Sequence, residues 1–154
     1  MVSSDSIDRP ALAAARLHST LLARVADTRE GRRHPDTAGE MAFADPNKHF
    51  KLLLAEYQAQ LGKDKPLPPS AEAVQQAKRG DTPPDDAAIA DLNAALLEKI
   101  QVPDSDLEAL GKARAQAIQQ ALVSNGIDAG RLFIAKAPSK PQSGDTVKIE
   151  LALK

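Results

Sequence analysis

The sequence predicts an α+β fold that is mostly helical, with about five helices followed by a small antiparallel pair of β-strands at the C-terminus. Apolar residues recur every three or four positions along most of the chain as far as Leu122, a spacing typical of amphipathic helices. In contrast, Val147, Ile149, Leu151 and Leu153 occupy alternate positions, which is the period of a half-buried strand. Clusters of proline and glycine separate these segments and mark their ends.

Composition limits both the core and the classes of function. The 154 residues carry a formal net charge of −1, no cysteine and 42% hydrophobic residues, but 28 of the residues are alanine. One domain fits this length, and its core must be thin because alanine buries little surface. The balanced charge argues against nucleic-acid binding, and no apolar run is long enough to span a membrane. The histidines lie far apart and cysteine is absent, so we expect no metal site and no cofactor.

The first predicted helix begins near Pro10, because proline suits the first helical turn. Residues 1–9 are predicted to form a disordered N-terminus. The helix should fade by Gly31, and residues 31–44 are predicted to be loop. The apolar face of the helix comprises Ala14, Leu17, Leu21 and Val25. A basic run near its end is interpreted as a solvated helix end or loop: Arg29, Arg32, Arg33 and His34.

The second predicted helix has Asp45 as its N-cap residue and Gly62 as its C-terminal stop. Its apolar face is expected to be the main contribution to the core and consists of Phe50, Leu53, Leu54, Tyr57 and Leu61. A proline-rich connector follows over residues 63–69. Ser70 is then expected to cap a short helix that extends to about Lys78.

Two more helices are predicted before the strands. Thr82 is expected to cap the first, which ends at Val102 because the residue before a proline is disfavoured in helical geometry. Ser105 and Glu108 have the spacing of a capping box for the second. That helix should end at Asn125-Gly126-Ile127, with Gly126 in the left-handed conformation. The two strands are predicted over residues 132–135 and 147–154.

The last third of the chain contains a series of residues that is typical of a known family. The series is Leu107, Leu110, Arg114-Ala115, Ile118, Leu122, Gly126-Ile127 and Arg131-Leu132-Phe133. It resembles the second helix and following strand of OmpA-like domains. The chain as a whole resembles the C-terminal domain of unknown function of large AsmA-like bacterial envelope proteins. The resemblance implies a single domain over residues 10–154, with a helical insertion over 45–103 and an OmpA-like helix–strand–strand end over 104–154.

The resemblance also implies candidate contact residues. OmpA-like domains bind the diaminopimelate of peptidoglycan through an aspartate of a Thr-Asp-x-x-Gly loop and the arginine of an Arg-Ala pair. Arg114 matches that arginine, but the chain lacks the loop, so the anionic half of the site is missing. Arg114 and Arg131 are therefore candidate contacts to a ligand or partner. The alternative for Arg114 is a structural salt bridge, for example with Asp106, Glu108 or Glu150. The family's first strand has no counterpart here, and we expect that it was cut away before Met1.

The resemblance implies a non-catalytic structural and interaction module of a larger, membrane-anchored cell-envelope protein. The module would be exposed to the periplasm and would serve envelope integrity or lipid traffic. Its expected partners are the rest of the parent protein, other envelope proteins or peptidoglycan. The alternatives are an OmpA-like peptidoglycan-binding module and a cytosolic helical adaptor that starts at Met1. Carboxylates cluster at Asp81, Asp85, Asp86 and Asp91, but turn and helix-start roles account for Asp81 and Asp85. Catalysis is not expected, because no His, Ser or Lys stands in a recognisable catalytic arrangement.

Overall fold

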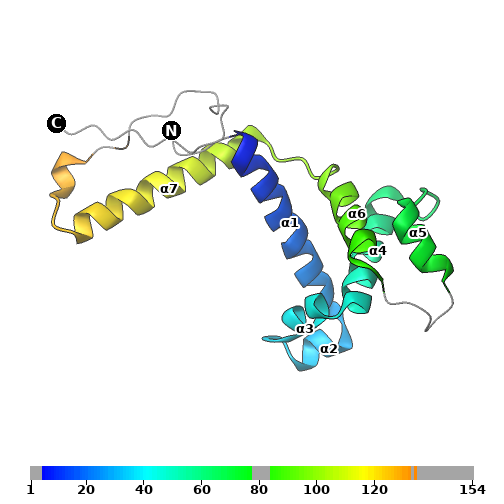
Figure 1. The fold of residues 1–154 in the computed structure, drawn as a ribbon. Helices are drawn as coiled ribbons and strands as arrows, with labels where there is room; N and C mark the ends of the chain where they lie inside the picture. The colour runs from blue at the N-terminus through cyan, green and yellow to red at the C-terminus, as the bar shows by residue number, and fades with distance from the viewer. Residues whose placement is uncertain (1–4, 78–83, 133, 135–154) are drawn as a thin grey trace. The chain divides into compact units, whose positions relative to one another are not determined.

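Apolar residues at helical spacing and polar residues at helix ends determine most of the architecture. The computed structural model describes residues 5–77, 84–132 and 134. These residues form seven α-helices and one 3-10 turn (Figure 1). The helices are α1 (Asp5–Asp27), α2 (Arg29–Arg33), α3 (Ala38–Ala44), α4 (Pro46–Leu61), α5 (Pro69–Gln76), α6 (Asp86–Leu97) and α7 (Asp104–Ser124), and the turn is η1 (Ala129–Arg131).

The predicted α+β class is wrong, because the residues that the structure describes are helical and include no β-strand. The first predicted strand fails for a local reason at Leu132. Its amide donates to the carbonyl of Ala129 at 3.2 Å, and its carbonyl accepts from the side chain of Gln119 at 3.2 Å. Both backbone groups are therefore used by local bonds rather than by a partner strand. The second predicted strand, over 147–154, lies outside the described residues, as does the loop before it.

The chain forms two compact units, one of residues 14–100 and one of residues 1–13 together with 101–154. Helix α1 contributes to both. It begins at Asp5, so residues 5–9 belong to a helix although the sequence predicts a disordered terminus there. The boundaries expected for a single domain over 10–154, with an insertion over 45–103, stay a prediction.

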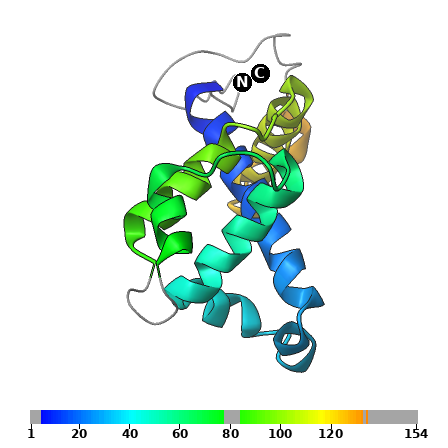
Figure 2. The same ribbon diagram turned by 90° about the vertical axis from the view of Figure 1, so that its right-hand side faces the viewer.

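The core of the larger unit is formed by α1, α4, α5 and α6. Helix α6 packs against both α4 and α5 (Figures 1 and 2). The small side chains of Ala71 and Ala88, both fully buried, let the backbones of α5 and α6 approach neighbouring helices closely. The buried set confirms the predicted apolar face of α4 at three positions and comprises Leu17, Leu21, Phe50, Leu53, Tyr57, Ala71, Ala88, Leu92 and Leu96.

Residues 38–44 form α3, although the sequence predicts a loop over 31–44. Ala38 and Ala42, one helical turn apart, are buried together with Val25, and α3 packs against α4. A Cβ atom at Gly39 would lie 2.6 Å from the side chain of Leu22. The sequence does not predict α3, because residues 31–44 contain two glycines and a proline. The helix is stabilised by close packing rather than by intrinsic propensity.

The predicted ends of α4 are confirmed. The side chain of Asp45 accepts hydrogen bonds from the amides of Asn47 at 2.9 Å and Lys48 at 3.3 Å, which satisfies two amides that the first turn leaves without a helical partner. At the other end Gly62 has φ 95°, a conformation that glycine adopts without strain.

The caps predicted for α5 and α6 differ from those observed. Helix α5 has Pro68 at its N-cap position without a side-chain cap, and Ser70 instead donates to Asp91 at 2.5 Å. Helix α6 is capped by Asp85, which accepts from the amide of Ala88 at 2.8 Å; Thr82 lies outside the described residues. The helix ends at Leu97, earlier than the predicted stop at Val102. A proline sets the last position that a helix can reach, but the helix can end before it.

The smaller unit contains α7, η1 and the first turns of α1. Helix α7 begins at Asp104 with Pro103 at the N-cap position and no side-chain cap. Ser105 therefore lies inside the first turn, two positions after the N-cap position that the predicted capping box requires. The predicted C-terminal end is confirmed, since Gly126 has φ 93° and the amide of Ile127 donates to the carbonyl of Leu122 at 3.1 Å.

Candidate functional site

Arg114, the residue expected to contact a ligand, forms a two-pronged ion pair with Asp8. Its Nη1 and Nη2 atoms donate to Oδ2 and Oδ1 of the carboxylate, each at 2.8 Å. The pair joins the middle of α7 to the start of α1, 106 positions away in sequence. Asp8 is only 1% exposed and the Arg114 side chain is 36% exposed. Parallel bonds between a guanidinium and a carboxylate are strong because both groups are charged and planar.

A second arginine reinforces the same junction within the smaller unit. The side chain of Arg9 donates to the carbonyl of Val102 and forms an ion pair with Asp104 at 2.6 Å. The two arginines thus fasten the first turns of α1 to the start and the middle of α7. The sequence predicts a salt bridge as the alternative role of Arg114, and the structure gives Asp8 as a partner in place of the suggested examples; of these, Glu150 lies outside the described residues.

Arg131, the other candidate contact residue, ends η1 and is exposed. Asp128 caps this turn by accepting from the amide of Gly130 at 2.9 Å, which fixes the backbone just before Arg131. Within the described ranges no ion pair joins Arg131 to another residue. The structure therefore gives the two candidate arginines different surroundings, with Arg114 held in a buried pair and Arg131 on the surface.

A site that sequence reasoning missed lies at α2. Arg29, Glu30, Arg33 and His34 line a shallow recess of about 320 Å³, called here the α2 recess. The sequence indicates only a solvated basic run at this place. The run is exposed as expected, but it forms a helical turn in which Arg29 and Arg33 are four positions apart and so project from the same face.

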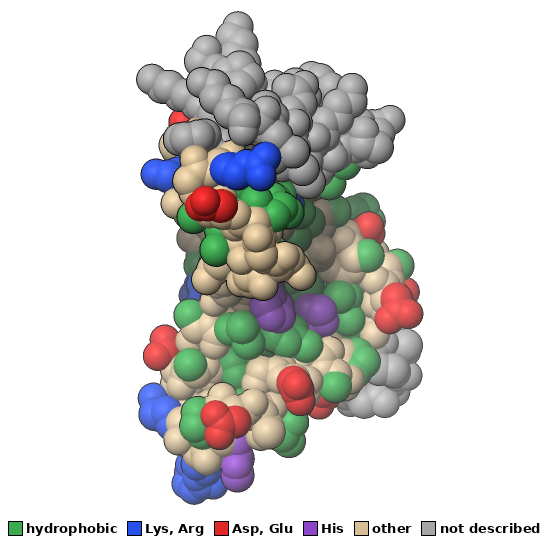
Figure 3. All heavy atoms as spheres, turned by 90° about the vertical axis from the view of Figure 1, so that its left-hand side faces the viewer, with side chains coloured by type: hydrophobic (Ala, Val, Ile, Leu, Met, Phe, Trp, Pro, Cys, Tyr) green, Lys and Arg blue, Asp and Glu red, His purple; other side chains and the backbone are tan. Residues whose placement is uncertain are grey.

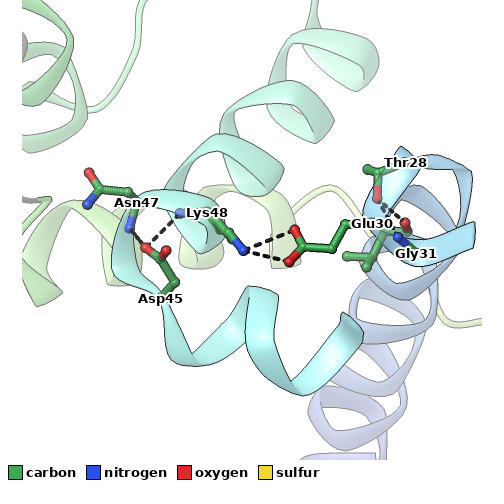
Figure 4. Close-up of polar contacts among 7 residues, drawn as sticks. Thr28, Glu30, Gly31, Asp45, Asn47 and Lys48 are labelled. Atoms are coloured by element: carbon green, nitrogen blue, oxygen red, sulfur yellow. Dashed lines mark hydrogen bonds and ion pairs between the residues drawn. The ribbon is translucent and has the colours of Figure 1, made fainter. Parts of the chain in front are cut away.

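Close contacts hold α2 against the end of α1. The hydroxyl of Thr28 donates to the carbonyl of Val25 at 2.6 Å and accepts from the amide of Gly31 at 3.0 Å (Figure 4). A Cβ atom at Gly31 would lie 2.0 Å from the Val25 carbonyl oxygen, so only glycine fits at this approach. The backbone that carries the recess is therefore fixed by sterics as well as by hydrogen bonds.

Glu30, the acidic residue of the recess, is paired with a lysine from α4. The ammonium of Lys48 lies 3.0 Å from each carboxylate oxygen of Glu30 (Figure 4). The amide of the same lysine donates to Asp45, the N-cap residue of α4. The cap therefore positions the residue that neutralises Glu30, which joins α4 to the α2 recess.

An aromatic cluster connects α1, α3 and α4. The ring of Phe43 stacks on His18 at a centroid distance of 4.9 Å and meets the edge of His49 at 5.3 Å. Burial lowers the pKa of His49 below its ordinary value of 6.5, and the charge of His18 lowers this pKa further. Histidine side chains lie among hydrophobic ones on the face drawn in Figure 3. The cluster is therefore a packing contact that favours the neutral form of His49.

The part of the chain that the structure describes contains neither a metal-binding cluster nor a membrane-spanning helix. No three histidine, aspartate or glutamate side chains gather there as a metal ion would require. No helix among the described residues is both long enough and apolar enough to cross a lipid bilayer.

Comparisons with models of protein families, with curated proteins and with solved structures find no match for this chain.

Proposed function

We propose that this chain is a non-catalytic structural and interaction module of a larger AsmA-like cell-envelope protein, exposed to the periplasm. The observation that carries the structural part is the pair between Asp8 and Arg114. In this pair Arg114, the best candidate ligand contact, holds α1 against α7. The cellular part rests on the resemblance of residues 104–134 to the OmpA-like ends of such proteins.

Exposed apolar side chains support an interaction role. Leu22 is 38% exposed and Met41 is 47% exposed, and both belong to elements of the larger unit, α1 and α3. Exposed apolar side chains mark a partner surface where they form a contiguous patch. Envelope integrity or lipid traffic is the process that the resemblance implies, and the parent protein or another envelope protein is the partner.

The peptidoglycan-binding alternative gives a direct test of this proposal. The chain is incubated with purified sacculi and sedimented, together with the variants Arg114→Ala and Asp8→Asn. A structural arginine predicts no pelleting of any of the three proteins. If Arg114 binds peptidoglycan, the wild type pellets, Arg114→Ala does not, and Asp8→Asn pellets at least as well because it removes the competing carboxylate of Asp8. That pattern would replace the proposal with the peptidoglycan-binding function.

A cytosolic helical adaptor is the second candidate, favoured by the helical architecture of the described residues. Fractionation of cells that produce the protein from its own gene separates the two. Recovery with the envelope, with protease access only after the outer membrane is permeabilised, is the expected result. Recovery in the cytosolic fraction would refute the envelope assignment. A photo-crosslinker at Met41, with one at the exposed Lys51 as the control position, then identifies the partner in the fraction that contains the protein.

A further inference from the structure

The charges around the α2 recess are unevenly neutralised. Residues 28–34 carry three arginines and one carboxylate, and that carboxylate, Glu30, is already held by Lys48 through both of its oxygens. Among the described residues no carboxylate forms an ion pair with Arg29, Arg32 or Arg33. The recess therefore keeps an excess of positive charge in a chain whose net charge is −1.

Acidic residues near this segment do not remove that excess. Asp27 and Asp36 flank the segment in sequence, and neither lines the recess. Among the described residues neither of them forms an ion pair with an arginine of this segment. The groups that line the recess include two arginines and one histidine.

The backbone beneath these side chains is organised before any ligand arrives. Thr28 caps the turn, Gly31 lies against the Val25 carbonyl, and Lys48 fixes the position of Glu30. A binding group carried by a fixed backbone loses less conformational entropy on binding than one carried by a mobile loop. At the lower end of the face shown in Figure 3, basic side chains lie next to a histidine and an acidic side chain.

We propose that the α2 recess binds the phosphate group of an anionic ligand. The guanidinium groups of Arg29 and Arg33 offer paired donors that match phosphate oxygens, and His34 adds a ring donor. Lys48 serves as a positioning residue, because it neutralises the one carboxylate that would repel the ligand. A volume of about 320 Å³ is at the small end of ligand pockets. It holds a phosphate together with part of the molecule that carries it, either a soluble phosphomonoester or a phospholipid headgroup.

Titrations with inorganic phosphate test the recess directly. Backbone amide shifts of the labelled chain are followed at neutral pH and low ionic strength. The test variant is the double substitution Arg29→Gln/Arg33→Gln. The matched control is Lys63→Gln/Lys65→Gln, which removes the same charge from exposed positions that do not line the recess. We expect shifts centred on residues 28–34, at least tenfold weaker binding in the test variant, and less than threefold weaker binding in the control.

Vesicles of phosphatidylglycerol and phosphatidylcholine, compared with phosphatidylcholine alone, identify the source of the phosphate. Binding to the anionic vesicles that the test variant loses and the control keeps assigns a lipid headgroup. Binding of free phosphate without binding to vesicles assigns a soluble phosphate ester. Equal losses in the test and control variants would show diffuse attraction to surface charge and overturn the proposal. So would the absence of binding to both probes while both double variants keep the wild-type circular dichroism spectrum.

Discussion

The pair between Asp8 and Arg114 predicts an asymmetric response to substitution. Replacing Arg114 with alanine leaves a carboxylate that is 1% exposed without this partner. Breaking a buried ion pair from one side costs about 3–5 kcal/mol, and the 36% exposure of the Arg114 side chain reduces the loss to about 2–3 kcal/mol through solvent screening. Replacing Asp8 with asparagine leaves a guanidinium that water can reach, so we expect about 1–2 kcal/mol.

Urea unfolding followed by far-UV circular dichroism measures these differences as free energies of unfolding. Asp104→Asn is the matched control, because it breaks the ion pair of Arg9, whose partners are 34% and 68% exposed, and such exposed pairs contribute less than about 1 kcal/mol. The reasoning is refuted if Asp8→Asn costs as little as Asp104→Asn. It is also refuted if Arg114→Ala is no more destabilising than Asp8→Asn, because burial of the carboxylate then has no effect on stability.

Three further predictions follow from the larger unit. Gly31→Ala places a Cβ 2.0 Å from a carbonyl oxygen and should lower the free energy of unfolding by about 2 kcal/mol or more. Gly62→Ala has open space around it but φ 95°, and should lower the free energy of unfolding by only about 1 kcal/mol. Thermal melting of the two variants measures this difference. Burial, with a smaller effect of His18, lowers the pKa of His49 below 6.5. As the pH falls, His49 therefore becomes protonated in the unfolded chain before it does so in the folded chain, and stability decreases as the pH drops below 6.5. In urea unfolding at several pH values, His49→Gln should lose less stability than the wild type over this pH range. Asp45→Ala removes a cap that accepts from two amides and should lower the unfolding free energy by about 1 kcal/mol, and an unchanged urea midpoint would contradict the role of this cap.

Features that depend on neighbouring residues could be predicted from the sequence. The Asp45 cap, the apolar face of α4 and the Gly126 end of α7 each follow from groups within a few positions of one another. The capping box at Ser105 failed by two positions, because the N-cap position is occupied by Pro103, whose carbonyl already accepts from the amide of Asp106. Helix α3 was missed because its stability comes from packing against Val25 and α4, which no local pattern encodes.

The candidate site shows the same limit more strongly. Arg114 could be singled out from its place in an OmpA-like series, but its partner lies 106 positions away in a segment predicted to be disordered. The arginines of α2 were visible as a basic run, but the carboxylate among them, Glu30, is neutralised by a lysine of α4. The spacing of four positions between Arg29 and Arg33 was the available signal. The ion pair that neutralises Glu30 is a tertiary contact, so the local sequence pattern does not predict it.

The alanine-lined packing of α5 and α6 has a thermodynamic consequence. Ala71 and Ala88 are fully buried, but each contributes far less apolar surface than the leucine or phenylalanine that fills such a position in a larger core. The increase in heat capacity on unfolding grows with the apolar surface that becomes exposed to water. A small heat capacity change flattens the curve of stability against temperature. The larger unit should therefore show a flatter curve of stability against temperature than a unit of the same size with leucine at these two positions.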